Sequence, residues 1–304
     1  MRQSVPDPTK PKDVLYHYFE QFKRLVICKY REIRLNKFNI YPKHRFTALK
    51  VFENSGKGKI AIVLANGPSV STLDQQKLKQ FIDTNNVEVF CVNYFPNSDF
   101  AKKIPLHYWV ISDPRHYDFS EQATIDVFEN VSLNLKKGIF LPDNVENKIT
   151  EYTKLPIIGF NDVQNSNIFS NNINPLFPRS YLSMTAYKAL AISLFGNYDK
   201  IYICGFDNTF IADLGCDQNN KIYRKAKHFY TKKDAHGEAI FKKDYLMGLG
   251  KYDKPRNRNV SQELLTYSRL FSEMDKFKDK RIINLDLNSL TDRFVKDNSL
   301  DIYV

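Results

Sequence analysis

Short apolar runs alternate with amphipathic stretches between residues 59 and 286. The runs are rich in Ile, Val, Phe and Tyr, and each ends at Gly, Pro, Asn or Asp or at a neighbouring residue. Runs of this length and composition are typical of buried parallel strands. We therefore expect strands at 59–65, 87–93, 107–113, 137–141, 156–159, 200–207 and 281–286.

Helical periodicity fills several of the intervals between these runs. Ser71 or Thr72 is expected to cap a helix after the first run. Ser183 is expected to cap a second helix, and Val260 and Ser261 to begin a last long one. Strands and helices that alternate in this way indicate an α/β protein with a doubly wound, mostly parallel, Rossmann-like sheet.

The N-terminal region reads as a separate basic arm over residues 1–50. Residues 1–12 carry three prolines and are expected to form a loose tail. Residues 13–38 have helical spacing, with one apolar face formed by Val14, Leu15, Tyr18, Phe19, Phe22, Leu25 and Val26. Three interpretations remain open: the face packs on the body, it rests on an anionic lipid surface, or it docks a partner. Residues 51–304 form the expected catalytic domain.

A polar, lysine-rich segment at about 208–259 shows weak periodicity inside this domain. Long segments of this kind are usually active-site lids or loops, so we expect an inserted lid here.

The charge of the chain indicates an anionic partner. The 304 residues carry a net charge of +11, which suits a nucleotide, an anionic glycan or a membrane face. No nucleic-acid-binding motif accompanies the charge, so nucleic acid is not the expected partner. The four cysteines lack metal or redox spacing, and no signal peptide or 18-residue apolar window is visible. A cytoplasmic protein is expected, with peripheral contact at the inner membrane face as an extension of that expectation.

Small polar residues follow five of the predicted strands. They are Asn66, Gly67 and Ser69; Asn93; Ser112 and Asp113; Asp207 and Asn208; and Asn288 and Ser289. Each one alone is usually a turn former or a helix cap. Ligands of open parallel sheets bind beyond the carboxyl ends of the strands, so the five together favour a nucleotide site.

The turn at residues 64–69, Leu-Ala-Asn-Gly-Pro-Ser, is neither a dinucleotide-binding Gly-x-Gly-x-x-Gly motif nor a P-loop. Gly67 is expected to let the backbone approach a phosphate or ribose, with the following helix N-terminus offering N–H groups. The predicted strand ends have no Asp-x-Asp pair, and the six histidines have no zinc spacing. We expect no metal and no cofactor.

These motifs, in this order, resemble the bacterial CMP-sialic-acid-dependent sialyltransferases of the Campylobacter type. The resemblance spans residues 59–295 and rests on the 64–69 turn, Cys91-Val-Asn93, Asp113-Pro114, the block from Ser183 through 201–207, and Asn288-Ser289-Leu290. It implies an inverting, metal-free glycosyltransferase, a variant of the glycosyltransferase A fold. Its donor would be a CMP-activated acidic sugar, sialic-acid-like or Kdo, and its acceptor a surface glycan.

The resemblance also assigns roles. The nucleotide or donor would be contacted by Asn66, Gly67, Pro68, Ser69, Asn93, Ser112, Ser183, Asn288 and Ser289. Arg179 would meet an anionic acceptor or the donor carboxylate, and Tyr223 or Tyr230 would take the place of a lid tyrosine. The family's histidine before the last helix is missing here, so the expected base is His228, with Asp113 and Asp207 as rivals. Two alternatives stay open: another nucleotide-dependent transferase, moving a phosphoryl, pyrophosphoryl or other sugar group, and a non-catalytic binder.

Overall fold

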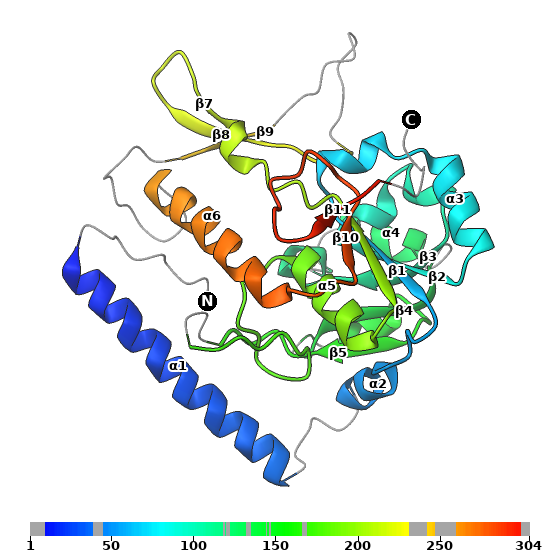
Figure 1. The fold of residues 1–304 in the computed structure, drawn as a ribbon, viewed down its shortest axis with the longest axis horizontal. Coiled ribbons are helices and arrows are strands. Elements are labelled where there is room, and N and C mark those ends of the chain that lie inside the picture. Colours follow the sequence, from blue (N-terminus) through cyan, green and yellow to red (C-terminus); the bar gives the residue numbers. More distant parts are fainter. Residues whose placement is uncertain are drawn as a thin grey trace.

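A computed structural model describes residues 10–38, 45–117, 119, 122–131, 135–143, 145, 147–165, 169–230, 242–246 and 260–298. Its centre is an eight-stranded sheet of order β11-β10-β6-β1-β2-β3-β4-β5, in which every neighbouring pair is parallel (Figure 1). The strands are β1 Ile60–Leu64, β2 Val87–Val92, β3 Leu106–Val110, β4 Leu135–Pro142, β5 Ile157–Phe160, β6 Lys200–Cys204, β10 Ile282–Asn284 and β11 Val295–Lys296. The expected α/β, doubly wound class is confirmed.

The order of the strands reverses at β1. The chain builds β1 to β5 outward in one direction, then returns to place β6 on the other side of β1. Leu64 is in register with Cys91 of β2 and with Cys204 of β6, so these strands end at the same level. A crevice for ligands is expected beyond the carboxyl ends at such a switch point.

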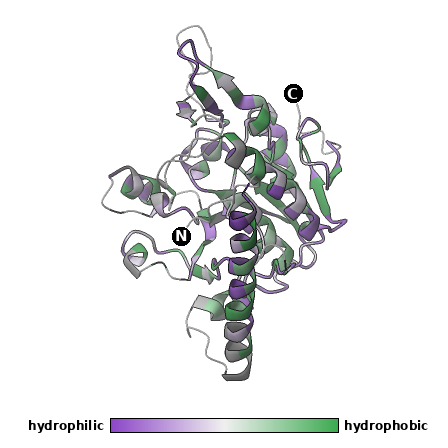
Figure 2. Ribbon diagram, turned by 90° about the vertical axis from the view of Figure 1, so that its left-hand side faces the viewer, coloured by the Kyte–Doolittle hydropathy of each residue, from purple (hydrophilic) through white to green (hydrophobic). Residues whose placement is uncertain are grey.

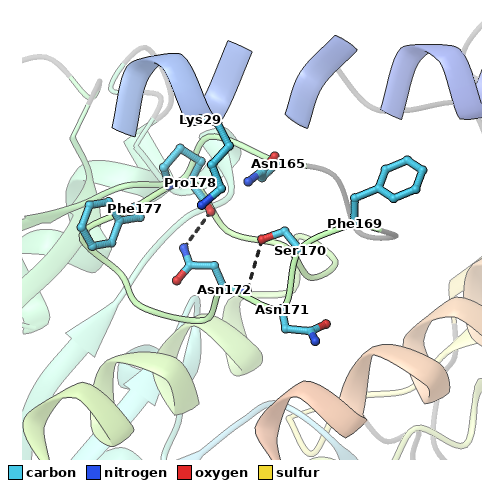
Figure 3. A pocket seen from close by; sticks show the side chains of 8 residues that line it. All are labelled: Lys29, Asn165, Phe169, Ser170, Asn171, Asn172, Phe177 and Pro178. Carbon is cyan, nitrogen blue, oxygen red and sulfur yellow. Dashed lines mark hydrogen bonds between the residues drawn. The ribbon is translucent and has the colours of Figure 1, made fainter. Parts of the chain in front are cut away.

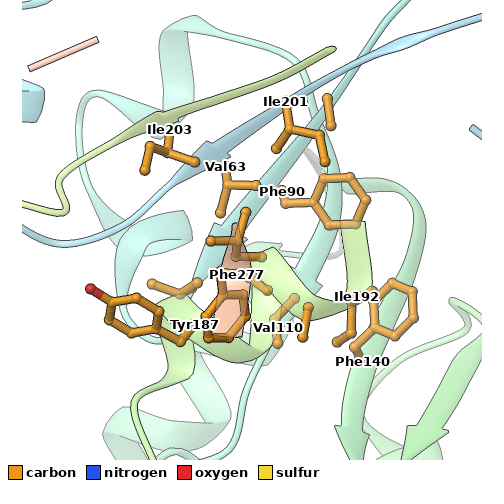
Figure 4. Close-up of a cluster of buried hydrophobic side chains, with 14 of the residues drawn as sticks. Val63, Phe90, Val110, Phe140, Tyr187, Ile192, Ile201, Ile203 and Phe277 are labelled. Atoms are coloured by element: carbon orange, nitrogen blue, oxygen red, sulfur yellow. The ribbon is translucent and has the colours of Figure 1, made fainter. Parts of the chain in front are cut away.

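Helices cover both faces of the sheet. One face packs against α2 (Arg45–Phe52), α5 (Thr185–Gly196) and α6 (Val260–Met274), and the other against α3 (Gln75–Thr84) and α4 (Gln122–Val131). Figure 4 shows part of the first cluster, where Tyr187 and Ile192 of α5 lie against Val63 and Val110 of the sheet. On the other face, Trp109 packs against Phe128 of α4 with ring centroids 4.8 Å apart. This three-layer packing positions the carboxyl edge of the sheet.

Short 3-10 turns join these elements. They span Pro68–Thr72, Phe95–Asn97, Ala101–Lys103, Pro114–His116, Asn147–Glu151, Phe210–Asp213 and Asp275–Phe277. Two expected helix caps were wrong, the first of them because of such a turn. Ser71 and Thr72 lie in the first turn and donate to carbonyls within it, so Asp74 caps α3 instead, accepting from two backbone amides. The residue that caps α5 is Met184, and Ser183 precedes it.

The described part of the expected lid contains a second sheet. Strands β7 (Leu214–Cys216), β8 (Ile222–Ala226) and β9 (Lys242–Tyr245) pair in antiparallel fashion and project from the body at the upper left of Figure 1. Residues 231–241 and 247–259 of the expected lid lie outside the described residues.

The basic arm contains two helices that differ in their packing. α1 (Pro11–Phe38) lies along the outside of α6 at the left of Figure 1 and faces the viewer in Figure 2. Among the side chains of α1 that the structure describes, Gln21 and Cys28 are buried, while most of the predicted apolar face is exposed. By contrast, Phe46 and Leu49 of α2 are buried in the main core. The boundary at residue 50 stays a prediction, as does a loose tail, since residues 1–9 lie outside the description.

None of the described helices is long and apolar enough to cross a bilayer.

Candidate functional site at the carboxyl edge

Ser69 and Asp207 bind each other across the switch point. The Ser69 amide donates to Asp207 Oδ1 at 2.9 Å, and the Ser69 hydroxyl donates to Asp207 Oδ2, also at 2.9 Å. The Gly205 amide in turn donates to the Ser69 hydroxyl at 3.0 Å. Burial, the largest cause, raises the pKa of Asp207, and the bonds from Ser69 oppose that rise. The polar atoms of this pair serve to join the ends of β1 and β6.

The packing around the Ser69–Asp207 pair leaves no room for a side chain at Gly67. A Cβ built there would lie 1.8 Å from Asp207 Oδ2 and 2.5 Å from the Gly205 carbonyl oxygen. Its backbone is extended, with φ at −69°, so no left-handed conformation is involved. The packing against Asp207 therefore explains this glycine without a ligand, and a close approach of phosphate to it stays a prediction.

Ser289 also acts within the protein. Its hydroxyl is buried and donates to the Phe206 carbonyl at 2.7 Å, which ties the segment after β10 to the end of β6. Asn208 has a left-handed backbone, with φ at 53°, and its side-chain amide donates to Tyr187 and Thr291. Asn288 is exposed nearby. Among these residues, only Asn288 presents its side chain outward.

Asn66 and Asn93 have buried side-chain oxygens that no donor in the described chain satisfies. Each lies two residues beyond the paired Leu64 and Cys91, so they occupy equivalent positions on adjacent strands. Neighbouring parallel strands are about 4.8 Å apart, so the two residues lie near each other at the edge. Asn93 has φ at 49°, and its carbonyl accepts from Trp109 Nε1 at 2.7 Å. The two asparagines form a pair of unused hydrogen-bond acceptors.

The segment expected to form a lid reaches this pair through Phe229. Its amide donates to the Asn66 carbonyl at 3.2 Å, and its ring packs against Phe95, with centroids 4.9 Å apart. The neighbouring His228 and Tyr230 are exposed, and their rings stack with centroids 5.1 Å apart. The structure thus brings His228 and Tyr230 to the strand end that carries Asn66.

Ser112 and Asp113 follow β3 and face the start of α5. The Ser112 hydroxyl lies 2.7 Å from the Thr185 hydroxyl, and both are buried. Asp113 is half-buried, and its charge contributes to the pKa shifts of Tyr117 and Lys188. Asp113 is therefore electrostatically linked to the first turn of α5.

A buried charge cluster lies behind Ser183. Lys188 of α5 donates to Asp162 at 2.7 Å and to the Ser183 hydroxyl at 2.9 Å. Arg179 donates to the same carboxylate at 2.8 Å and to the carbonyl of Tyr181. Burial, the largest cause, lowers the pKa of Lys188 to about 8. Arg179, expected to meet an anionic ligand, has these internal partners at 5% exposure.

Sequence reasoning missed three residues at this edge. Asp162 and Lys188 carry no motif, because only the fold places them together. His116 is buried beyond β3 and packs edge-on against Tyr94, with ring centroids 4.1 Å apart. The sequence offered one signal for His116, which lies three residues after Asp113. The rule that ligands bind beyond the carboxyl ends of parallel strands would have placed it at this edge.

A cavity of about 400 Å³ lies between α1 and the loop that follows β5 (Figure 3). It is lined by Lys29, Asn165, Phe169, Ser170, Asn171, Asn172, Phe177 and Pro178. Asn172 donates to the Pro178 carbonyl, and Ser170 accepts from the Asn172 amide, so these groups also shape the loop. Asn66 and Asn93 do not line this cavity. Over the described residues, no three His, Cys, Asp or Glu side chains gather as a metal site.

The chain matches no family model and no curated protein. Among solved structures it is similar to the MAf glycosyltransferase from Magnetospirillum magneticum AMB-1, at a TM-score of 0.48 and 12% sequence identity. The match covers 81% of this chain and 34% of that one, so this chain spans about a third of the neighbour's length. A likeness at this level does not identify a function, which must come from the site.

Proposed function

We propose that the protein is a glycosyltransferase that uses a nucleotide-activated sugar, and that its preferred donor is a CMP-activated acidic sugar. The observation that carries the proposal is the pair of unsatisfied amide oxygens of Asn66 and Asn93 at the switch point of the sheet. A buried acceptor without a partner costs about 1–3 kcal/mol, and a ligand that supplies a donor recovers it.

The chemistry of the pair selects the part of the ligand that binds there. An amide oxygen accepts from hydroxyl and amino groups, whereas an ionised phosphate has no hydrogen to donate. Ribose hydroxyls and the amino group of cytosine are donors of the required kind. The nucleoside therefore lies over the pair, and the sugar lies toward the lid.

The lid supplies the groups for transfer. The anomeric carbon forms a bond to the acceptor oxygen as its bond to the phosphate oxygen breaks, and the acceptor hydroxyl loses its proton. His228 is the proposed base, with Tyr230 stacked beside it, and Phe229 holds both at the Asn66 strand end. Of the rival carboxylates, Asp207 is bonded to Ser69 through both oxygens, which leaves Asp113 as the stronger rival.

The remaining contacts follow from this arrangement. Ser112 and Ser183 line the approach to α5, and Asn288 lies at the β6 side of the edge, where it would contact the base or the lid. Arg179 supports Ser183 through the Asp162–Lys188 cluster. The reaction proceeds without a metal ion and without a cofactor, and the acceptor is a surface glycan. The protein acts on the cytoplasmic side.

A transfer assay in EDTA tests the proposal. The protein is incubated with a CMP-activated sialic acid, CMP-Kdo, a UDP-sugar or ATP, and a fluorescent oligosaccharide acceptor, and nucleotide release and labelled product are both measured. The proposal expects release of CMP with a matching amount of extended acceptor. Phosphoryl or pyrophosphoryl transfer from ATP, without sugar transfer, would instead make the protein the alternative kind of transferase. A requirement for added magnesium or manganese would overturn metal independence.

A further inference from the structure

Helix α1 carries an apolar stripe that the rest of the described chain leaves uncovered. The side chains of the stripe are 49 to 73% exposed, and they recur at spacings of three and four. They are Leu15, Tyr18, Phe19, Phe22, Val26, Tyr30 and Ile33. With about 1.5 Å of rise per residue, the 28 residues of α1 extend about 42 Å. Contiguous exposed apolar surface of this extent marks an interaction site.

The other side of the helix already has its partner. Gln21 is fully buried and Cys28 is 4% exposed. Burial, and secondarily the charge of Arg269 in α6, lowers the pKa of His17. α1 therefore rests against the body through its Gln21–Cys28 side. The apolar stripe points away from the body, opposite to the orientation of an ordinary packed amphipathic helix.

Charges on the helix are arranged to suit an anionic surface. At about 100° per residue, the exposed Lys12 and Lys23 lie within about 75° of the centre of the stripe, whereas Lys29 reaches into the cavity beside the body. Asp13 and Glu20 lie about 130–150° from that centre. The outward half of the described helix thus combines apolar side chains with Lys12 and Lys23, and Glu20, which lies 3.5 Å from Lys23, stands at its border.

The width of the exposed apolar face favours a lipid surface over a second helix as its occupant. Tyr16 and Ile27 are also exposed, at 65% and 40%, and they widen the apolar face well beyond the stripe. A two-helix seam needs only a narrow stripe, whereas an interfacial helix presents a broad apolar face with flanking cations. The aromatic side chains suit the boundary between headgroups and acyl chains.

We propose that α1 lies flat on an anionic lipid surface, with the stripe sunk into the headgroup boundary and the lysines against lipid phosphates. The proposal rests on α1 alone and holds whether or not the carboxyl edge transfers sugar. It selects one of the three interpretations that the sequence leaves open, and it names the occupant of the face.

Vesicle sedimentation of the full chain, without nucleotide, tests the proposal. The protein should bind vesicles of mixed phosphatidylcholine and phosphatidylglycerol at least about tenfold more tightly than vesicles of pure phosphatidylcholine, and salt should weaken the binding. Val26→Asp should lower binding to the mixed vesicles at least about tenfold, because it places a negative charge in the stripe. The matched control is Val51→Asp, since Val51 is an exposed valine on α2. It should change binding less than about twofold.

Three results would overturn the proposal. One is equal binding to charged and neutral vesicles, and another is a Val26→Asp variant that binds like the wild type. The third is a dimer in sedimentation equilibrium that Val26→Asp dissociates, which would make a second copy of the chain the occupant. Both valines are exposed, so each variant should unfold at the midpoint of the wild type, which confirms that it is folded.

Discussion

Ser69 hydrogen-bonds both oxygens of the Asp207 carboxylate, one through its backbone amide and one through its hydroxyl. The two residues are 138 positions apart in the sequence, and they join the turn after β1 to the end of β6. At the switch point of the sheet, the protein thus uses one serine and one aspartate to fix the two strand ends between which a ligand would bind.

Ser69→Ala should lower the free energy of unfolding by about 1–3 kcal/mol, because it leaves Asp207 Oδ2 buried without its donor. Urea denaturation measures this loss. Ser71→Ala is the matched control, since the Ser71 hydroxyl is exposed and bonds only within its own turn. Equal stability of the two variants would contradict a clamping role for Ser69.

Asp207 should make the stability of the protein depend on pH in a defined direction. Its folded pKa lies above the usual 3.8, so the folded state holds the proton more tightly than the unfolded state. The contribution of Asp207 to stability is therefore full below pH 3.8 and is lost as pH rises through the folded pKa. The free energy of unfolding of the wild type, minus that of Asp207→Asn, should fall with rising pH in this window. A rising difference would contradict the assignment.

Lys188 should make the stability of the protein depend on pH in the alkaline range. Burial lowers its pKa from 10.5 to about 8, so between these values the unfolded chain binds the proton and the folded chain has released it. Stability should therefore rise with pH across this window, relative to Lys188→Met. Chemical denaturation at several pH values measures the difference. A flat difference would mean that Lys188 titrates at its ordinary value.

The sheet was predictable from sequence because each buried strand is a short apolar run that ends at a turn former. The register and the burial of these runs depend on the same pattern, so β1, β2 and β6 lie where the runs predict. The two-residue β11 and strands β7 to β9 were not predictable, because each is very short or mixes charged with apolar residues and so lacks the continuous apolar run of the buried strands.

At the site, sequence identified the strand ends but not which side chains are free. In the sequence, Asn66 and Asp207 are equally plausible ligand contacts. Only the fold shows that Asp207 is hydrogen-bonded to Ser69, while the Asn66 side-chain oxygen has no donor. The sequence pattern also did not predict which way the apolar stripe of α1 faces. An apolar stripe indicates an amphipathic helix, but it does not say whether the stripe faces the core or the outside.

His228→Ala should lower the rate of sugar transfer at least about a hundredfold, because the acceptor hydroxyl would lose its base. Nucleotide affinity should change little, since the histidine is exposed and the Asn66 carbonyl is held by the amide of Phe229. The steady-state kcat, compared with the dissociation constant of the nucleotide, separates the two effects. Near-native turnover of this variant, with loss of turnover in Asp113→Asn, would place the base on the carboxylate.

The central claim is that the asparagine pair binds the nucleoside of the donor, and calorimetric titration of CMP tests it most directly. Asn66→Ala removes one unsatisfied acceptor, and Asn93→Gly removes the other while keeping the left-handed backbone that glycine tolerates. Asn97→Ala, an exposed asparagine just after β2, is the control. We predict that the wild type and the control bind CMP equally, and that the two site variants bind at least about tenfold more weakly. Unchanged affinity in both site variants would contradict the claim.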